Sequence, residues 1–210
     1  MLSSLASVLR FGAGAGAQAA DIREPIILYE FEGCPFCRIA REAVSETGTP
    51  ALVRPCPKGG ARFRPSVKEE GGKAQFPYMI DPNNDVRLYE SADIAKYLHR
   101  TYGGKSRPLI HLLGPLNLVT SQFAVLARFM SGTFVRKSSP PAQPLEFYAA
   151  ERNPGARLAK ELLCVMEIEY LWFSRTKEEL AEPVLFDPNT GETETGSAKI
   201  CDYLRRRYCP

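Results

Sequence analysis

The sequence has little of what several common functions require. Its two histidines and Cys56 do not supply a second ligand pair at zinc-knuckle spacing for the single Cys-x-x-Cys motif. The net charge of +3 is too small to indicate nucleic-acid binding. The six cysteines lack the regular spacing of a disulfide framework, and four of them are scattered singly. We therefore expect no metal site, no nucleic-acid partner and a reducing compartment.

Acidic residues are missing from the first twenty positions, and Asp21 is the first. This Ala/Gly-rich stretch with Arg10 is more similar to an organelle transit segment than to a secretory signal. Its leucines at positions 2, 5 and 9 could instead form the apolar stripe of a packed extension. We expect residues 1–22 to be an N-terminal extension, and the sequence leaves open whether it targets the chain or contacts a partner or a membrane.

An uninterrupted apolar run long enough for a membrane span is also missing. Residues 109–127 carry no formal charge but are interrupted by His111, Gly114-Pro115, Asn117 and Gln122. A transmembrane helix needs ~20 predominantly apolar residues. We expect an amphipathic helix within a linker at residues 106–142, packed between domains, on a membrane surface or on a protein partner. Its apolar stripe consists of Leu116, Val119, Phe123, Leu126 and Met130.

The feature that carries chemistry is Cys34-Pro35-Phe36-Cys37, between a strand-like run at 25–31 and a helix-like run at 38–47. A thiol at a helix N-terminus meets free N–H groups and the positive end of the helix dipole, which favour the reactive thiolate. We predict that Cys34 is the nucleophile and that Cys37 is the resolving or second thiol. The alternatives are half of a zinc site or two inert buried cysteines.

The segments that follow predict a thioredoxin-type α/β layout. We expect a strand at 51–55, a helix at 62–70 that ends at Gly71-Gly72, and a proline-led strand at 76–80. A turn at 81–85 and a strand at 86–89 complete a hairpin. Ser91 is expected to cap the helix that follows.

The same order of elements returns near the C-terminus, which indicates an internal repeat. Residues 144–148 match 25–29, residues 183–189 match 77–83, and residues 197–204 match 91–98. Residues 153–156 occupy the place of the Cys-x-x-Cys motif without its thiols. We predict an α/β fold of two tandem thioredoxin-like domains, at 23–105 and 143–210, joined by the apolar helical linker. The second domain is expected to be shortened and degenerate, without the helix between its second strand and its proline-led strand.

The first domain resembles the glutathione-binding half of glutaredoxins and glutathione S-transferases. In such domains a proline with a cis peptide bond faces the dithiol, and this resemblance makes Pro77 the candidate. It implies that the glutathione sulfur meets Cys34, beside Pro35 and Phe36, and that Phe76-Pro77 binds the cysteinyl backbone. Glu90-Ser91 would hold the γ-glutamyl end at a helix N-terminus. In the second domain Pro183 and Ser197 remain, but Gly196 stands where Glu90 is.

Residues 30–37, 76–79 and 89–91 further resemble plant and algal proteins with tandem glutathione S-transferase N-terminal-type domains, over about residues 23–210. Such proteins are generally plastid-targeted, so the resemblance implies the chloroplast, with the mitochondrion or the cytoplasm as alternatives.

We therefore predict a glutaredoxin-like, glutathione-dependent thiol–disulfide oxidoreductase with glutathione as co-substrate and glutathionylated or disulfide substrates. One alternative is a non-catalytic scaffold or accessory subunit of a larger complex, such as one on a plastid membrane, that makes contacts through residues 1–20 and 109–130. A third is a glutathione transferase. A glutathione-ligated iron–sulfur cluster at Cys34 has no positive support in the sequence.

Two details concern the surroundings of the dithiol. Arg38 and Arg41 could steady the thiolate or a carboxylate, but charges on a solvated helix surface explain them more simply. The sequence leaves open whether Cys56 reaches the active site or is a small apolar residue.

Overall fold

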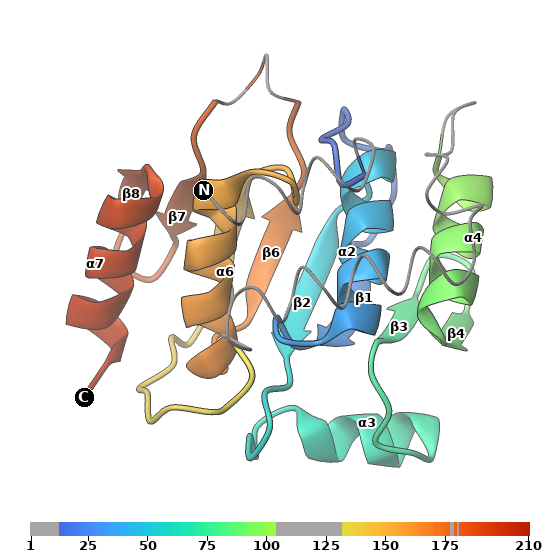
Figure 1. Cartoon of the computed structure of the whole chain (residues 1–210), viewed down its shortest axis with the longest axis horizontal. Coiled ribbons are helices and arrows are strands. Elements are labelled where there is room, and N and C mark those ends of the chain that lie inside the picture. The colour runs from blue at the N-terminus through green and yellow to red at the C-terminus, as the bar shows by residue number, and fades with distance from the viewer. Residues whose placement is uncertain (1–12, 104–131, 177–178, 180) are drawn as a thin grey trace.

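The computed structural model of the chain describes residues 13–103, 132–176, 179 and 181–210 (Figure 1). The first half contains strands and helices close to the expected positions, although the helix expected at 62–70 begins at Arg64. Its elements are β1 (Ile26–Glu30), α2 (Pro35–Thr47), β2 (Ala51–Pro55), α3 (Arg64–Gly71), β3 (Tyr78–Asp81), β4 (Val86–Tyr89) and α4 (Ser91–Thr101).

The second half follows the same order, except that its described residues contain no helix between the second and third strands. Its elements are β5 (Leu145–Tyr148), α6 (Pro154–Val165), β6 (Tyr170–Phe173), β7 (Val184–Asp187), β8 (Glu192–Thr195) and α7 (Ser197–Tyr208). Strand pairing also repeats: β1 is parallel to β2 and antiparallel to β3, as β5 is to β6 and β7. The order of strand pairing in the first half therefore returns in the second half.

The two halves share one mixed sheet of eight strands in the order β4-β3-β1-β2-β6-β5-β7-β8. They meet through β2 and β6, which pair antiparallel with Leu52 opposite Leu171. Leu52 is the second residue of β2 to pair with β1, and Leu171 is the second residue of β6 to pair with β5. The two leucines are therefore at equivalent positions in the two halves. The halves are thus related by an approximate twofold rotation whose axis passes between these two leucines. The edge of each small sheet is covered by the other, which removes two unpaired strand edges.

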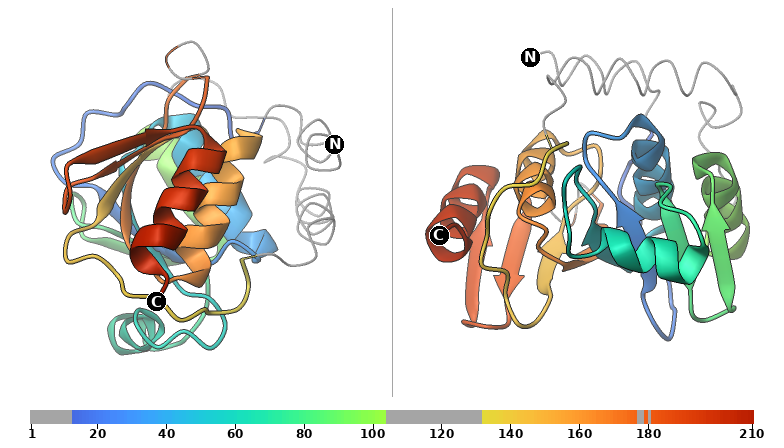
Figure 2. Two further views of the ribbon diagram at one scale, coloured as in Figure 1. Left: turned by 90° about the vertical axis from the view of Figure 1, so that its left-hand side faces the viewer. Right: turned by 90° about the horizontal axis from the view of Figure 1, so that it is seen from below.

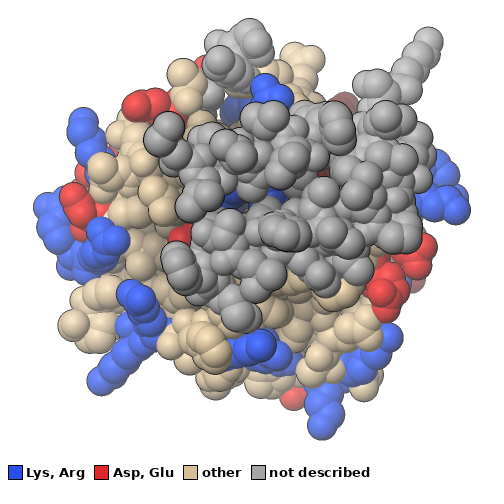
Figure 3. Space-filling view, viewed as in Figure 1, with Lys and Arg blue, Asp and Glu red and all other residues tan. Residues whose placement is uncertain are grey.

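Two apolar clusters lie on opposite faces of the sheet. Figure 2 shows α2, α4, α6 and α7 together on one face, whereas α3 lies apart from them. Ile26 and Leu28 belong to the larger cluster beneath the four helices. Tyr29 belongs to a smaller cluster with Val67 of α3, because successive side chains of a strand point to opposite faces. Around the face seen in Figure 3, side chains of both charge signs are spread along the rim.

In each half, the last helix region is hydrogen-bonded to the aspartate of the Asp-Pro-Asn turn. Two tyrosine hydroxyl groups of the helix region donate to one carboxylate in each half. These are Tyr97 and Tyr102 to Asp81, at 2.5 and 2.6 Å, and Tyr203 and Tyr208 to Asp187. The repeated sequence motif therefore has the same structural role twice.

The prediction that Ser91 caps α4 is wrong. Glu90 is the N-cap residue, with φ of 65°, and Ser91 is the first helical residue. Gly196, with φ of 90°, holds the equivalent N-cap position of α7. In both halves a residue with positive φ connects the hairpin to the helix, and this residue, one position before the serine, is the N-cap.

Some predicted features lie outside the described residues. These are the amphipathic helix at 109–130, residues 1–12 of the extension, and most of the linker predicted at 106–142. No helix within the described ranges has both the length and the apolar character needed to cross a membrane.

The shared sheet predicts that damage to the first half is felt in the second. Leu28 is fully buried, and replacing such a leucine with alanine costs about 2–5 kcal/mol. We expect Leu28→Ala to lower the urea midpoint reported by fluorescence of Trp172, the single tryptophan, which lies on β6. Leu158→Ala, at a side chain that is 55% exposed, is the matched control and should leave that midpoint unchanged. An unchanged Trp172 transition in Leu28→Ala would mean that the halves unfold separately.

Candidate functional site

Cys34 is the N-cap residue of α2, as the sequence predicts. Its backbone is extended, and its Sγ accepts a hydrogen bond from the backbone N–H of Cys37 at 3.2 Å. Pro35 occupies the first helical turn, where a missing N–H removes no hydrogen bond. This local geometry brings the sulfur to the free N–H groups and the positive dipole of a 13-residue helix.

The environments of the two thiols move their pKa values in opposite directions. A hydrogen bond from the Cys37 thiol, the Cys37 backbone N–H and the charge of Arg41 together lower the pKa of Cys34. Burial and the neighbouring sulfur of Cys34 raise the pKa of Cys37 well above its ordinary value. Cys34 is therefore the thiol that can ionise, and Cys37 is the thiol that stays protonated and donates to it.

Arg38 and Arg41 are not surface charges, so that expectation is wrong. Both side chains are buried. The Nε of Arg38 contacts Glu42 at 3.0 Å, one helical turn further along α2. Arg41 lies behind the dithiol, and a buried guanidinium requires carboxylate partners. Its contacts are with Glu30, with Glu32 at 3.1 Å and with Glu151 at 3.1 Å.

Glu30, at the end of β1, is fully enclosed next to this arginine. Burial raises its pKa to about 7, with a further upward contribution from Glu32, whereas Arg41 acts in the opposite direction. The negative charge of Glu30 also raises the pKa of both Cys34 and Cys37. Ionisation of this carboxyl group therefore opposes ionisation of the nucleophile.

The structure brings the predicted glutathione-binding residues of the first half into one neighbourhood. The peptide bond between Phe76 and Pro77 is cis, as the resemblance implies. The Phe76 ring meets Phe31 of the dithiol loop edge-on, with ring centroids 6.1 Å apart. On the other side, the amide of Gln75 donates to the carboxylate of Glu90. Phe76-Pro77 is thus connected both to the loop before Cys34 and to the start of α4.

The start of α4 suits a carboxylate ligand. Its N-cap residue, Glu90, makes no side-chain hydrogen bond to the first turn, so the Glu90 side chain does not cap the N–H groups there. Ser91 is nearly buried at this position. Phe36, beside Cys34, is 42% exposed and offers an apolar contact for a ligand on the same side.

The segment that begins at Gly132 connects the dithiol loop to the second half. A Cβ atom at Gly33 would lie 2.0 Å from the Thr133 Oγ1, so only glycine allows this close approach. The Cys164 Sγ of α6 accepts from the Glu32 backbone N–H at 3.3 Å and contacts the Gly132 carbonyl oxygen at the same distance. Residues more than a hundred positions away therefore shape the loop that carries Cys34.

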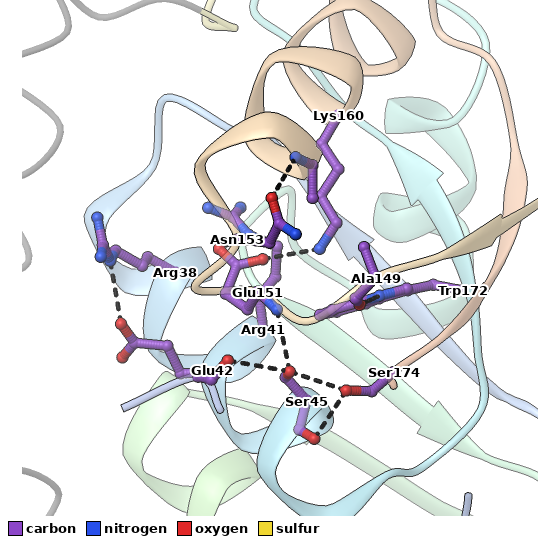
Figure 4. A network of polar contacts seen from close by, with 12 residues as sticks. Arg38, Arg41, Glu42, Ser45, Ala149, Glu151, Asn153, Lys160, Trp172 and Ser174 are labelled. Atoms are coloured by element: carbon purple, nitrogen blue, oxygen red, sulfur yellow. Dashed lines mark hydrogen bonds and ion pairs between the residues drawn. The ribbon is translucent and has the colours of Figure 1, made fainter. Parts of the chain in front are cut away.

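A polar network at the junction of the halves supports this loop from behind (Figure 4). Glu151 follows β5, and its carboxylate is shared by Arg41 and by the Lys160 Nζ at 2.7 Å. Although burial alone would raise it, these cations hold the pKa of Glu151 well below its usual value. The Lys160 ammonium lies 3.1 Å from the centroid of the Trp172 ring. Sequence reasoning missed this network, because its members are far apart along the chain.

Ser45 adds a neutral contact to the same junction. Its hydroxyl group accepts from the Glu151 backbone N–H at 3.0 Å and lies 2.9 Å from the Ser174 Oγ. The only indication of this contact in the sequence is that Ser45 falls on the buried face of an amphipathic helix.

The second half has no equivalent of the thiol site. Asn153 replaces Cys34 as N-cap, and its Oδ1 accepts from the N–H groups of Gly155 and Ala156. Within the described part of the chain the only cis peptide bond precedes Pro77, so the bond before Pro183 is trans. Cys56 is also no part of the dithiol site: its thiol contacts the Arg54 carbonyl oxygen, and burial raises its pKa.

Comparison with protein families found one match. Residues 28–106 match the family model of the glutathione S-transferase N-terminal domain. This part of the chain is a glutathione S-transferase N-terminal domain of thioredoxin-like fold. The matched range contains the dithiol, Phe76-Pro77 and Glu90-Ser91. The domain therefore relates the chain to glutathione-linked redox and transferase families. A comparison with curated proteins found no match.

The raised pKa of Glu30 predicts how stability depends on pH. The folded chain holds the proton of the Glu30 carboxyl group more tightly than the unfolded chain, in which the pKa of this group is near 4.5. The resulting stabilisation is present below about pH 4.5 and is lost as the pH rises through about 7, by about 1.4 kcal/mol per unit of pKa difference. We expect the free energy of unfolding, measured with urea in a Cys34→Ser background, to fall between about pH 5 and 8.

Glu30→Gln keeps a neutral side chain at every pH, so this slope should disappear. Glu24→Gln, at an exposed glutamate of the same half, should retain the slope of the background. An equal slope in all three proteins would show that another group controls stability in this range.

Proposed function

We propose that the chain is a glutathione-dependent thiol–disulfide oxidoreductase of glutaredoxin type, with Cys34 as nucleophile. The observation that carries this proposal is the hydrogen-bonded pair at the start of α2, in which the pKa of Cys34 is lowered and that of Cys37 is raised. A thiol that ionises next to one that stays protonated is suited to attack a disulfide. The domain match to glutathione-linked families supports the same reaction class.

In the proposed cycle, the Cys34 thiolate attacks the glutathione sulfur of a mixed disulfide between glutathione and a substrate. The substrate leaves as a thiolate and takes up a proton, and Cys34 becomes disulfide-linked to glutathione. A second glutathione thiolate attacks this adduct, which releases glutathione disulfide and restores Cys34. In the alternative second step, Cys37 loses its proton, attacks Cys34 and releases glutathione, leaving an internal disulfide that external thiols reduce.

The residues that would bind glutathione lie around Cys34. The Phe76 backbone before Pro77 would pair with the cysteinyl part of the ligand. The N-terminus of α4, with Glu90 and Ser91, would bind the γ-glutamyl carboxylate and amine through free N–H groups and a side-chain carboxylate. Pro35 and the exposed Phe36 ring would cover the apolar side of the ligand.

We further propose a tandem organisation, with thioredoxin-like units at 23–105 and 143–210. The repeated strand pairing and the paired Asp-Pro-Asn turns support this division. The second unit lacks thiols at its equivalent site and acts through its contacts with the first. In this proposal residues 1–22 direct the chain to the chloroplast, and residues 1–20 and 109–130 contact a membrane surface or a protein complex.

A second candidate function is that of an accessory subunit. It is favoured by the low exposure of the dithiol, since Cys34 is 4% exposed and Cys37 is fully buried. A conjugating glutathione transferase is less well supported, because the described part of the second half forms an α/β unit joined to the first sheet rather than an all-helical domain.

The test is intact-mass spectrometry of the purified chain after exposure to glutathione disulfide at neutral pH. We expect wild type to gain a glutathione adduct or an internal disulfide, and Cys34→Ser to gain neither. Cys37→Ser should accumulate the glutathione adduct, because only external glutathione can resolve it. Cys209→Ser, at an exposed cysteine away from the site, is the matched control and should behave as wild type at the dithiol.

Dithiothreitol should reverse both products, and the same wild-type protein should turn over a glutathionylated peptide. Thiols that stay inert in wild type, or an adduct that persists in Cys34→Ser at the same yield, would overturn the oxidoreductase. The first of these results would favour the accessory subunit.

A further inference from the structure

Two buried arginines occupy equivalent positions in the two halves. Arg38 follows the N-cap Cys34 by four residues, and Arg157 follows the N-cap Asn153 by four. They are 2% and 4% exposed. The helices that carry them, α2 and α6, are neighbours on the same face of the sheet, above the β2–β6 junction (Figures 1 and 2). The approximate twofold axis therefore relates two buried arginines on neighbouring helices.

The two positive charges act on each other. Burial lowers the pKa of Arg38, and the positive charge of Arg157 lowers it further, whereas Glu42 and Glu151 act in the opposite direction. Two like charges in an enclosed place raise the free energy of the folded chain unless an opposite charge lies between them.

The hydrogen-bond donors of this pair are largely unused. Arg38 donates from Nε to Glu42, but its Nη1 has no acceptor in the part of the chain that the structure describes. For Arg157, the Nε, Nη1 and Nη2 atoms all lack an acceptor among the described residues. Burying a charged donor without a partner is among the most costly arrangements in a protein interior. The guanidinium of Arg157 is thus the least satisfied cation at the junction.

Of the two carboxylates that act on Arg38, Glu42 is bound to Arg38 itself and Glu151 is bound to other cations. The two oxygens of Glu151 contact the Arg41 Nε at 3.1 Å and the Lys160 Nζ at 2.7 Å. The chain segments 1–12 and 104–131 contain no aspartate or glutamate, so neither can supply a carboxylate side chain to Arg157. Within the described residues, no carboxylate oxygen is hydrogen-bonded to the Arg157 guanidinium.

We propose that Arg38 and Arg157 form a binding site for one small oxyanion, of the size and chemistry of inorganic phosphate, at the junction of the two halves. Guanidinium groups present planar pairs of N–H donors that match the oxygens of phosphate or sulfate. An anion held by donors from α2 and α6 neutralises the repulsion and connects the halves. This site is independent of the thiol chemistry proposed above.

The site is tested by thermal unfolding of the full chain, followed by Trp172 fluorescence. The protein is first dialysed extensively against phosphate-free buffer, and phosphate is then titrated while sodium chloride holds the ionic strength constant. A ligand that binds only the folded chain raises its Tm with saturation. We expect phosphate and sulfate to raise the Tm of wild type saturably, and chloride alone to have no such effect.

Arg157→Gln removes a cation that has no hydrogen-bonded carboxylate partner. No carboxylate therefore loses a hydrogen-bond partner in this variant. We expect this variant to lose the phosphate response and to have a higher Tm than wild type in phosphate-free buffer, because an unpaired buried charge is gone. Arg152→Gln, at an exposed arginine of the same half, is the matched control and should keep the full response.

Three results would overturn the proposal. These are no saturable phosphate response in wild type, an equal response in Arg157→Gln, or a response reproduced by chloride at the same ionic strength. If Arg157→Gln fails to fold, ion chromatography decides. Wild type is equilibrated with phosphate, freed of excess by gel filtration and then denatured. It should release about one phosphate per chain, held by both arginines. Release of none would overturn the site.

Discussion

The rest of the structure depends on the burial of one guanidinium group, that of Arg41. It contacts Glu30 at the end of β1, Glu32 from the dithiol loop and Glu151 from the second half. A charge in this position is tolerated only if its partners stay in place, because removing one partner leaves a buried charge uncompensated. The loop before Cys34 and the loop after β5 are therefore held to the same guanidinium group, and the two halves cannot separate without exposing it.

This constraint reaches the chemistry of the dithiol. Arg41 favours the thiolate of Cys34, and Glu30 opposes it. The second half determines this balance through Glu151, which competes for the same guanidinium, and through Cys164, which bonds to the backbone of Glu32. A half without thiols at its own helix start thus helps to set the reactivity of the half that has them.

The repeat shows which features serve architecture and which serve chemistry. Both halves retain a polar N-cap, an arginine four residues later and a cation seven residues later, the last being Arg41 or Lys160. The side chain at the cap differs: sulfur in one half and an amide in the other. Arg41 and Lys160 both bind the carboxylate of Glu151 at the junction, so the cation has a structural role even in the half whose cap has no thiol.

The local elements could be predicted from the sequence: the strand before Cys34, the N-cap thiol, the proline of Phe76-Pro77 and the repeated turns. These follow from short-range patterns of apolar spacing, proline and capping residues. Only the tertiary structure decided that Arg41 is buried, because its partner Glu151 lies 110 residues away and a charged helix residue ordinarily faces solvent. The pairing of Leu52 with Leu171 could not be predicted from the sequence either, because the residues of an edge strand do not specify which other edge strand it pairs with.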